Sequence, residues 1–235
     1  MTRICTICAR GGSKGVKNKN LRELLEKPLI AHSILQAKAS KLFDVIAISS
    51  DSDEILRVAK EYGADYVIKR PNELATDTAA KLPVIQHCVK EVEQLSNLQF
   101  DIMTDFDATS PLRTIEDIQN AIDILERHQD ASNLITATNA RRSPYFNLVE
   151  EDENGYVHIS KALKETVVRR QDAPKTYDMN ASIYAWKRES FFNAQSVFTD
   201  KTILFIMPEE RSQDIDSELD FEIVKLLAEK RGSLV

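Results

Sequence analysis

The feature that most constrains the fold of this chain is an alternation of short apolar runs with longer segments of helical periodicity. Residues 3–9 and 44–49 are short runs rich in β-branched side chains, and residues 29–40 between them carry apolar side chains at helical spacing. Such a strand–helix–strand unit joins two parallel strands. The alternation continues with expected helices at 53–62, 82–95 and 114–128 and expected strands at 65–68 and 101–106. The pattern predicts an α/β fold with a doubly wound, mostly parallel sheet, helices on both faces and ligands at the carboxyl ends of the strands.

The alternation stops between residues 140 and 178. Two short segments, 145–149 and 155–159, flank the turn-like sequence Glu-Asp-Glu-Asn-Gly and read as a hairpin. Strand-like and helical patterns return afterwards, at 181–186, 202–206 and 217–231. The sequence thus predicts a main α/β domain made of residues 1–139 and 179–235, and an excursion over residues 140–178 that acts as a dimerisation arm or a lid.

Composition and cysteine content narrow the class of protein. The chain has 43% hydrophobic and 29% charged residues, as globular proteins do, and no stretch reaches the roughly 18 apolar residues that span a bilayer. The first residues run into an apolar strand without the features of a signal peptide, so we expect a cytoplasmic protein with no membrane partner. Three cysteines argue against a disulfide framework. Cys5 and Cys8 have the spacing of a metal or redox pair, but in a strand they point to opposite faces, which favours burial in the core.

The charge of the chain is unevenly distributed. The net charge of −6 speaks against a nucleic-acid partner. Residues 1–27, however, hold seven Lys and Arg side chains and only two Glu, a local charge of +5 in an otherwise acidic protein. A cationic island of this kind indicates that a small polyanion binds at one place.

A glycine-rich turn directly follows the first expected strand, with the sequence ARGGSKGVKNKN over residues 9–20. Its glycines allow the backbone to approach a ligand and to turn N–H groups toward it, while Arg10, Lys14 and Lys19 supply positive charge for phosphates. The spacing matches neither the P-loop, GxxxxGK[ST], nor the dinucleotide fingerprint, GxGxxG. A solvated basic turn is the alternative, but glycines, a hydroxyl and cations coincide at the carboxyl end of a strand, which favours phosphate binding.

Two aspartates near the end of the chain have two interpretations. Asp214 and Asp216 are separated by one residue, so in an extended segment both carboxylates can point to one side and bind a hard cation such as Mg²⁺. Acidic residues before a helix can equally stabilise its N-terminus. The residues alone leave both readings open. No dedicated general base is evident, because the four histidines are scattered and lie outside the motifs.

Six motifs together resemble the acylneuraminate cytidylyltransferases, the CMP-sialic acid synthetases and their bacterial relatives. They occur in the family's order and extend over nearly the whole chain: ARGGSKGVKNKNLR (9–22), RPNELATDTA (70–79), ATSPLR (108–113), RQDAP (170–174), NASIY (180–184) and DIDSELD (214–220). The resemblance implies a Rossmann-like nucleotidyltransferase sheet and an enzyme that joins CMP from CTP to an acidic nine-carbon sugar, releasing pyrophosphate. It also implies a homodimer built through the excursion.

The resemblance further assigns roles to residues of this chain. Those implied for nucleotide binding are Arg10, Gly11, Gly12, Ser13, Lys14, Lys19, Asn20, Arg70, Thr78 and Ala79, with Asn20 at the nucleotide sugar and the last three at cytosine. Those implied for the sugar side are Asp107, Thr109, Ser110, Arg170, Gln171, Asp178, Asn180 and Tyr184. Asp214 and Asp216 would bind Mg²⁺ or Mn²⁺, which favours metal binding over the helix-capping reading. The residues implied for catalysis are Arg10, Lys19, Asp214 and Asp216.

Two departures from the family pattern bear on the sugar. Sialic acid synthetases usually carry Gln where this chain has Asp107, and Arg where it has Asp178. A carboxylate only accepts hydrogen bonds, and loss of a cation removes an attraction for an acidic sugar. The departures favour a nonulosonate with nitrogen at carbon seven, such as legionaminic acid, whose extra amide N–H needs an acceptor. The alternatives are a CMP-N-acetylneuraminate synthetase, a 3-deoxy-octulosonate cytidylyltransferase, and a CTP-binding sensor or scaffold without turnover.

Overall fold

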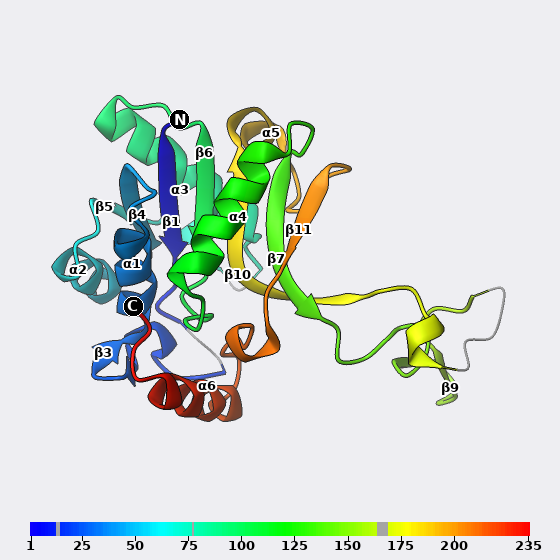
Figure 1. Cartoon of the computed structure of the whole chain (residues 1–235). Helices are drawn as coiled ribbons and strands as arrows, with labels where there is room; N and C mark the ends of the chain where they lie inside the picture. Colours follow the sequence, from blue (N-terminus) through cyan, green and yellow to red (C-terminus); the bar gives the residue numbers. More distant parts are fainter. Residues whose placement is uncertain (13–14, 77, 164–168) are drawn as a thin grey trace.

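The computed structural model describes residues 1–12, 15–76, 78–163 and 169–235. Within these residues a seven-stranded sheet runs in the order β11-β7-β10-β6-β1-β4-β5 (Figure 1). Its strands are β1 (Arg3–Cys8), β4 (Val45–Ser50), β5 (Tyr66–Lys69), β6 (Ile102–Phe106), β7 (Asn133–Asn139), β10 (Tyr177–Lys187) and β11 (Thr202–Ile206). The pairs β1–β4, β1–β6, β4–β5 and β7–β11 are parallel, whereas β10 is antiparallel to both β6 and β7. The sheet is therefore mostly parallel, as the alternation predicts.

Helices cover both faces of the sheet. The helices are α1 (Leu29–Ser40), α2 (Asp53–Glu61), α3 (Lys81–Ser96), α4 (Ile115–Arg127), α5 (Arg188–Asn193) and α6 (Glu218–Arg231). Apolar side chains of α1, α2 and α4 form one buried core with the sheet, and those of α3 and α5 form the core on the opposite face. A third core beside the end of the chain contains residues of α6. The doubly wound arrangement predicted from the sequence is confirmed.

Local chemistry sets where several helices begin. The hydroxyl of Ser52 accepts a hydrogen bond from the backbone N–H of Ile55 and starts α2. Thr114 with Asp117 and Ser217 with Asp220 form reciprocal capping boxes at the starts of α4 and α6. Among the described residues, four single 3₁₀ turns lie in the connections: η1 (Lys19–Leu21), η2 (Asn72–Leu74), η3 (Arg170–Asp172) and η4 (Glu209–Arg211).

The pleat of β1 separates its two cysteines. Cys5 is fully buried in the core beneath α1, α2 and α4, whereas Cys8 packs beside the core on the α3 face. This confirms that the two side chains point to opposite faces of the strand. Among the residues that the structure describes, no helix is both long enough and apolar enough to cross a bilayer.

A hairpin extends away from the sheet between β7 and β10 (Figure 1). Its strands are β8 (Val149–Glu151) and β9 (Val157–Ile159), and its outward side chains are largely exposed. Strand β10 begins at Tyr177, which pairs with Asn139 at the end of β7. The register of β10 against β7 shifts between Met179 and Tyr184, where Ala181 adopts a left-handed φ of 53°. This bulge turns the first part of β10 toward the root of the hairpin.

Some elements were not expected from the sequence. These are β7, α5 and the small hairpin formed by β2 (Glu23–Leu24) and β3 (Lys27–Pro28). Strand β7 has the sequence NLITATN, in which buried Asn133 and Thr136 interrupt the apolar run. Both are satisfied by side-chain hydrogen bonds that only the folded chain provides, from Asn133 to the Val197 carbonyl and from Thr136 to Asn180. Periodicity alone therefore did not identify this strand.

Candidate active site

A cavity of about 410 Å³ lies at the carboxyl ends of β1, β5 and β6. This is the edge of the sheet where α/β proteins of this type bind ligands. Residues from four of the six sequence motifs meet there, although they are distant in the chain. The predicted site residues that line the cavity are Arg10, Lys19, Asn20, Arg70, Ala79, Asp107, Thr109 and Asp216.

The glycine turn and the Asp-x-Asp segment are in direct contact. The Lys19 ammonium lies 3.5 Å from a carboxylate oxygen of Asp216 and also donates to the carbonyl of Ile215. The backbone is equally close, because a Cβ added to Gly15 would lie 2.0 Å from the carbonyl oxygen of Asp216. The absence of a side chain at Gly15 therefore allows these two segments to pack together, and cations and carboxylates meet at one wall of the cavity.

The loop that follows β4 supports the glycine turn. A carboxylate oxygen of Asp51 accepts a hydrogen bond of 2.9 Å from the backbone N–H of Gly11. A Cβ on Gly11 would lie 3.0 Å from the Cβ of Ser52, so this position is also tight. Gly12 has no neighbour within 4 Å of such an atom among the residues described. The predicted phosphate ligands Ser13 and Lys14 lie outside the described residues.

Two of the three predicted cytosine residues, Arg70 and Ala79, line the cavity. Arg70 is buried, and its guanidinium donates to the carbonyl of Ser49 at 2.9 Å and to its hydroxyl at 3.3 Å. Ala79 lines the cavity, while Thr78 is exposed with its hydroxyl 3.4 Å from that of Thr76. Within the cavity, Asn20 donates from its side chain to the Arg10 carbonyl at 3.0 Å. The Asn20 side-chain oxygen has no hydrogen-bond partner in the described structure, which leaves it for a ligand.

Asp107 is held by a lysine that the sequence analysis did not single out. Lys81, the first residue of α3, places its ammonium 2.7 Å from one carboxylate oxygen of Asp107. The other oxygen accepts from the N–H and the hydroxyl of Thr109, at 3.1 and 2.9 Å. Burial raises the pKa of Asp107, but the Lys81 charge and these hydrogen bonds outweigh burial and lower it to about 2. A cation in the first turn of a helix opposes the helix dipole, and this was the available sequence signal for Lys81.

Asp214 is a carboxylate in an unfavourable electrostatic environment. It is partly buried in the irregular segment before α6. Burial raises its pKa first, and the charges of Asp216 and Asp107 raise it further. Hard oxygen donors that repel one another in this way are typical of a place where a cation binds. Within the described ranges no three His, Cys, Asp or Glu side chains are grouped closely enough to hold a metal by themselves.

Three predicted sugar-side residues are buried behind the cavity wall. Ser110 donates to the backbone carbonyl of Asn180 at 3.0 Å, and Asn180 donates to the Ser212 hydroxyl at 3.0 Å. Tyr184 stacks on Trp186 with the ring centroids 5.8 Å apart. The side chains of these three residues do not line the cavity.

The remaining predicted sugar-side residues lie at the root of the hairpin. Asp178 accepts a hydrogen bond of 3.0 Å from the backbone N–H of Arg141 and lines a different cavity of about 820 Å³. Arg170 donates to the carbonyl of Ala140, and the neighbouring Gln171 is exposed in η3. The fold of one chain therefore separates Asp178 from Asp107.

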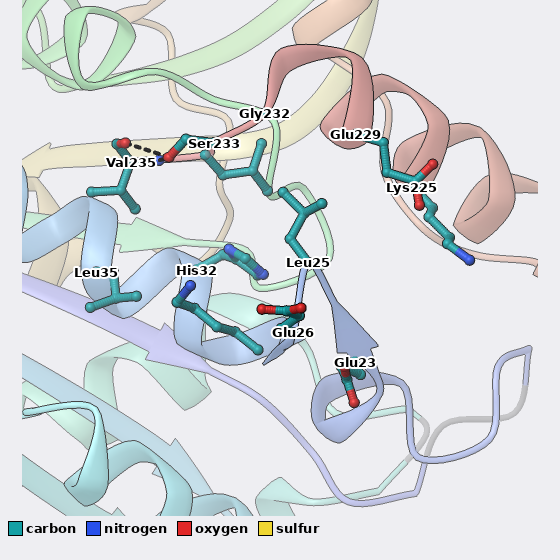
Figure 2. Close-up of a pocket in the computed structure, with 12 residues that line it drawn as sticks. Glu23, Leu25, Glu26, His32, Leu35, Lys225, Glu229, Gly232, Ser233 and Val235 are labelled. Atoms are coloured by element: carbon teal, nitrogen blue, oxygen red, sulfur yellow. Dashed lines mark hydrogen bonds between the residues drawn. The ribbon is translucent and has the colours of Figure 1, made fainter.

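A further cavity of about 640 Å³ opens between the β2–β3 hairpin, α1 and the last residues of the chain (Figure 2). None of the described residues that line this cavity belongs to the six motifs. His32 forms part of its wall. The His32 side chain is buried with Nε2 2.7 Å from the carbonyl of Leu24, and burial lowers its pKa. His32 therefore braces the β2–β3 hairpin.

Comparison with known proteins shows the family of the chain. The model of the family described as "Cytidylyltransferase" matches residues 4–230, and the chain belongs to this family of enzymes. The chain is 51% identical over 224 residues to the CMP-N,N'-diacetyllegionaminic acid synthase of Campylobacter jejuni, covering 95% of this chain and 94% of that one. It is 50% identical over 229 residues to the post-translational flagellin modification protein B of Campylobacter coli, covering 97% and 96%. A solved CMP:2-keto-3-deoxy-manno-octonic acid synthetase with CTP has the same fold, with a TM-score of 0.68 at 15% identity and coverage of 98% and 100%.

Proposed function

We propose that this cytidylyltransferase transfers CMP from CTP to an acidic nine-carbon 2-keto sugar of the legionaminic acid type and releases pyrophosphate. The observation that carries the proposal is the meeting of Lys19 and Asp216, 3.5 Å apart, at a cavity that Asp107 also lines. A cationic turn beside Asp216 at one wall of the cavity fits a metal-bound triphosphate. Asp107, which replaces the glutamine of sialic acid synthetases, fits a sugar with an additional N–H donor. The 51% identity to a protein named for N,N'-diacetyllegionaminic acid supports this sugar class.

The nucleotide would lie between the glycine turn and Arg70. A triphosphate carries roughly four negative charges, which need local compensation. Arg10 and Lys19 line the cavity and would bind the phosphates, and the Asn20 side-chain oxygen, which has no partner among the described residues, would accept from a ribose hydroxyl. Arg70, with the backbone at Thr78 and Ala79, would contact the cytosine base.

Asp214 and Asp216 would hold a magnesium ion together with phosphate oxygens. Mg²⁺ usually takes one or two carboxylates and completes its shell with water and substrate phosphates, so the lack of a third grouped ligand in the described chain fits a metal that arrives with CTP. The raised pKa of Asp214 fits as well, because a cation would offset the repulsion from Asp216. When bound, the ion would neutralise charge on the α-phosphate and acidify the attacking hydroxyl.

The protein's own residues would then position the reactants. The anomeric hydroxyl of the sugar attacks the α-phosphorus, and pyrophosphate leaves on the opposite side, so alignment and charge compensation dominate the rate. Lys19 would compensate the negative charge on the phosphates, and Asp107 would accept a hydrogen bond from the sugar. Lys19 pairs with Asp216 in the ligand-free chain, so this cation changes partners when the nucleotide binds.

A homodimer would complete the sugar side of the site. Several apolar side chains of the hairpin are exposed, among them Val149, Val157 and Ile159, and a second copy would cover them. The same contact would bring Arg170, Gln171 and Asp178 of the hairpin root near the other chain's cavity.

A sugar panel tests the proposed function. The enzyme is assayed for pyrophosphate release from CTP and Mg²⁺ with legionaminic, pseudaminic, N-acetylneuraminic and 3-deoxy-octulosonic acids. We expect fastest turnover with legionaminic acid, abolished by EDTA and by Asp216→Asn and restored by Mg²⁺ only in the EDTA case. Fastest use of neuraminic or octulosonic acid would assign a different sugar, and CTP binding without release for every sugar would indicate a sensor or scaffold.

A further inference from the structure

The ammonium of Lys81 lies close to two carboxylates and an aromatic ring. Its Nζ is 2.7 Å from Asp107 Oδ2, 3.3 Å from Asp105 Oδ2 and 4.6 Å from the centroid of the Tyr184 ring. Of these neighbours, Asp107 accepts a hydrogen bond from the ammonium, whereas Asp105 and the Tyr184 ring interact with its charge. Lys81 lines the cavity, and its charge is shared between two carboxylates.

The second carboxylate of the group is inside the protein. Asp105 is fully buried in β6, and the Thr6 hydroxyl donates to its Oδ1 at 2.7 Å. Oδ2 lies 3.3 Å from the Lys81 ammonium and has no hydrogen-bond partner among the described residues. Burial raises the pKa of Asp105, and the Lys81 charge and the Thr6 bond oppose that rise. One lysine thus stabilises two carboxylates, one buried and one at the cavity.

Asp107 has a fixed orientation because every part of it is held. Its carbonyl accepts from the buried guanidinium of Arg113, one carboxylate oxygen binds Thr109 and the other binds Lys81. A carboxylate has about four acceptor positions, and three are used by the protein. One acceptor position therefore remains for a ligand in the cavity.

We propose that Lys81 is a positioning residue that fixes the charge and direction of Asp107 toward the sugar, so that Asp107 presents a single hydrogen-bond acceptor to an amide or hydroxyl of the substrate. The inference rests on the proposed function and deepens it, because it assigns the acceptor role to a Lys81–Asp107 unit. Lys81 acts through Asp107 and touches neither the nucleotide nor the sugar.

Removal of the ammonium should make substrate binding depend on pH. Two neighbouring carboxylates without a cation cannot both stay ionised easily, so in Lys81→Met a proton would be retained by Asp105 and Asp107 at acidic pH. Other charged or titratable groups face this pair from Tyr184 on β10, from the buried Arg113 and from Asp214 before α6. These groups are present in both wild type and variant, so the difference between the two profiles reports on Lys81.

The kinetic test compares Lys81→Met and Lys81→Arg with the wild type between pH 5 and 9, with legionaminic acid and CTP as substrates. In Lys81→Met we expect the KM for the sugar to rise about 10- to 100-fold at the acidic end, as for loss of a hydrogen bond to a charged group, and to recover as pH increases. The KM for CTP should stay within about twofold, and Lys81→Arg should restore the profile of the wild type. Lys90→Met is the matched control, since Lys90 is an exposed lysine on the same helix.

Two results would overturn the inference: a pH profile of Lys81→Met equal to that of the wild type, or an equal rise in the KM for CTP, which would make Lys81 a direct phosphate ligand. A second measurement does not need turnover. ¹³C NMR of the Asp side chains should give a higher Asp107 pKa in folded Lys81→Met than in the wild type, and an unchanged pKa would contradict the role of Lys81. Wild-type protein that makes no CMP-sugar would count against the proposed function alone, because the NMR comparison would still decide the inference.

Discussion

The ammonium of Lys19 lies 3.5 Å from the carboxylate of Asp216. One residue belongs to the turn after the first strand and the other to the segment before the last helix, so the two ends of the chain together build one wall of the cavity. The sequence placed a cationic island early and a pair of aspartates late, and the parallel sheet with α6 beside it brings them into contact.

Lys19→Met should reduce catalysis with little effect on folding. The variant loses a cation at the phosphate side of the cavity, so kcat/KM for CTP should fall by roughly 100-fold, as for removal of one charge-stabilising donor. Pyrophosphate release measures the effect, and Lys17→Met, an exposed lysine of the same turn, should change it less than about threefold. Equal losses in the two variants would mean that only the net charge of the turn matters.

Gly15→Ala should push the glycine turn away from the segment that carries Asp216. The added methyl group would lie 2.0 Å from the Asp216 carbonyl, so one backbone segment has to move, and we expect a loss of about 1–3 kcal/mol in the free energy of unfolding. Thermal unfolding measures this loss. Gly12→Ala should leave Tm unchanged, because nothing described lies within 4 Å of the new methyl group; a similar drop in both variants would point to backbone flexibility instead of the contact.

Asp214→Asn should stabilise the ligand-free protein while it reduces activity. The pKa of Asp214 is raised in the folded state by burial and then by Asp216, so ionisation of this group disfavours folding once pH exceeds its unfolded value. The Tm difference between variant and wild type should be small at low pH, grow as pH rises through the carboxyl range, and then level off. Activity with Mg²⁺ should fall at least about 100-fold, and a Tm difference that is independent of pH would contradict the electrostatic explanation.

Arg113→Lys should destabilise the fold through the loop that carries Asp107. The guanidinium is fully buried and donates to four acceptors: Ser182 Oγ, Ser33 Oγ, Gln36 Oε1 and the Asp107 carbonyl. A lysine cannot reproduce this fork, so we expect a loss of about 3 kcal/mol in unfolding free energy. Chemical denaturation checks the value, and Arg127→Lys on the exposed face of α4 should change it by less than about 0.5 kcal/mol.

The hairpin provides a test of assembly. Val157→Lys with Ile159→Lys places two charges on its exposed apolar strand, which should convert a dimer to a monomer in light scattering at micromolar concentration. A wild-type protein that is already monomeric at that concentration would rule out the proposed dimer, and a dimeric double variant would place the interface elsewhere.

The sequence predicted the parts of the fold that follow from local periodicity. The helix predicted at 29–40 is α1 with the same limits, and the other predicted helices differ from the observed ones by a residue or two at their ends. The reversed direction of β10 could not be predicted, because a lone apolar run gives no strand polarity. The bulge at Ala181 could not be predicted either, because alanine rarely adopts a positive φ and gives no sequence signal for one.

The candidate site was predictable where motifs supplied it and not where tertiary contacts did. Lys19, Arg70 and Asp216 carry recognisable sequence patterns and line one cavity. Lys81 joins the site only because the fold brings its ammonium within 3.3 Å of Asp105 and 2.7 Å of Asp107, and no local pattern specifies these contacts. Asp178 was expected on the sugar side with Asp107, and the bulge of β10 places it in another cavity of the same chain. Its role in sugar binding stays a prediction that depends on a second subunit.

The tight approach of Gly15 to Asp216 has a thermodynamic consequence. Since the turn that faces the triphosphate and the segment that carries the acidic pair touch through their backbones, a shift of either one displaces the other. Affinities for the cation and for CTP should therefore be linked by a shared free energy, each ligand tightening the other by an equal factor.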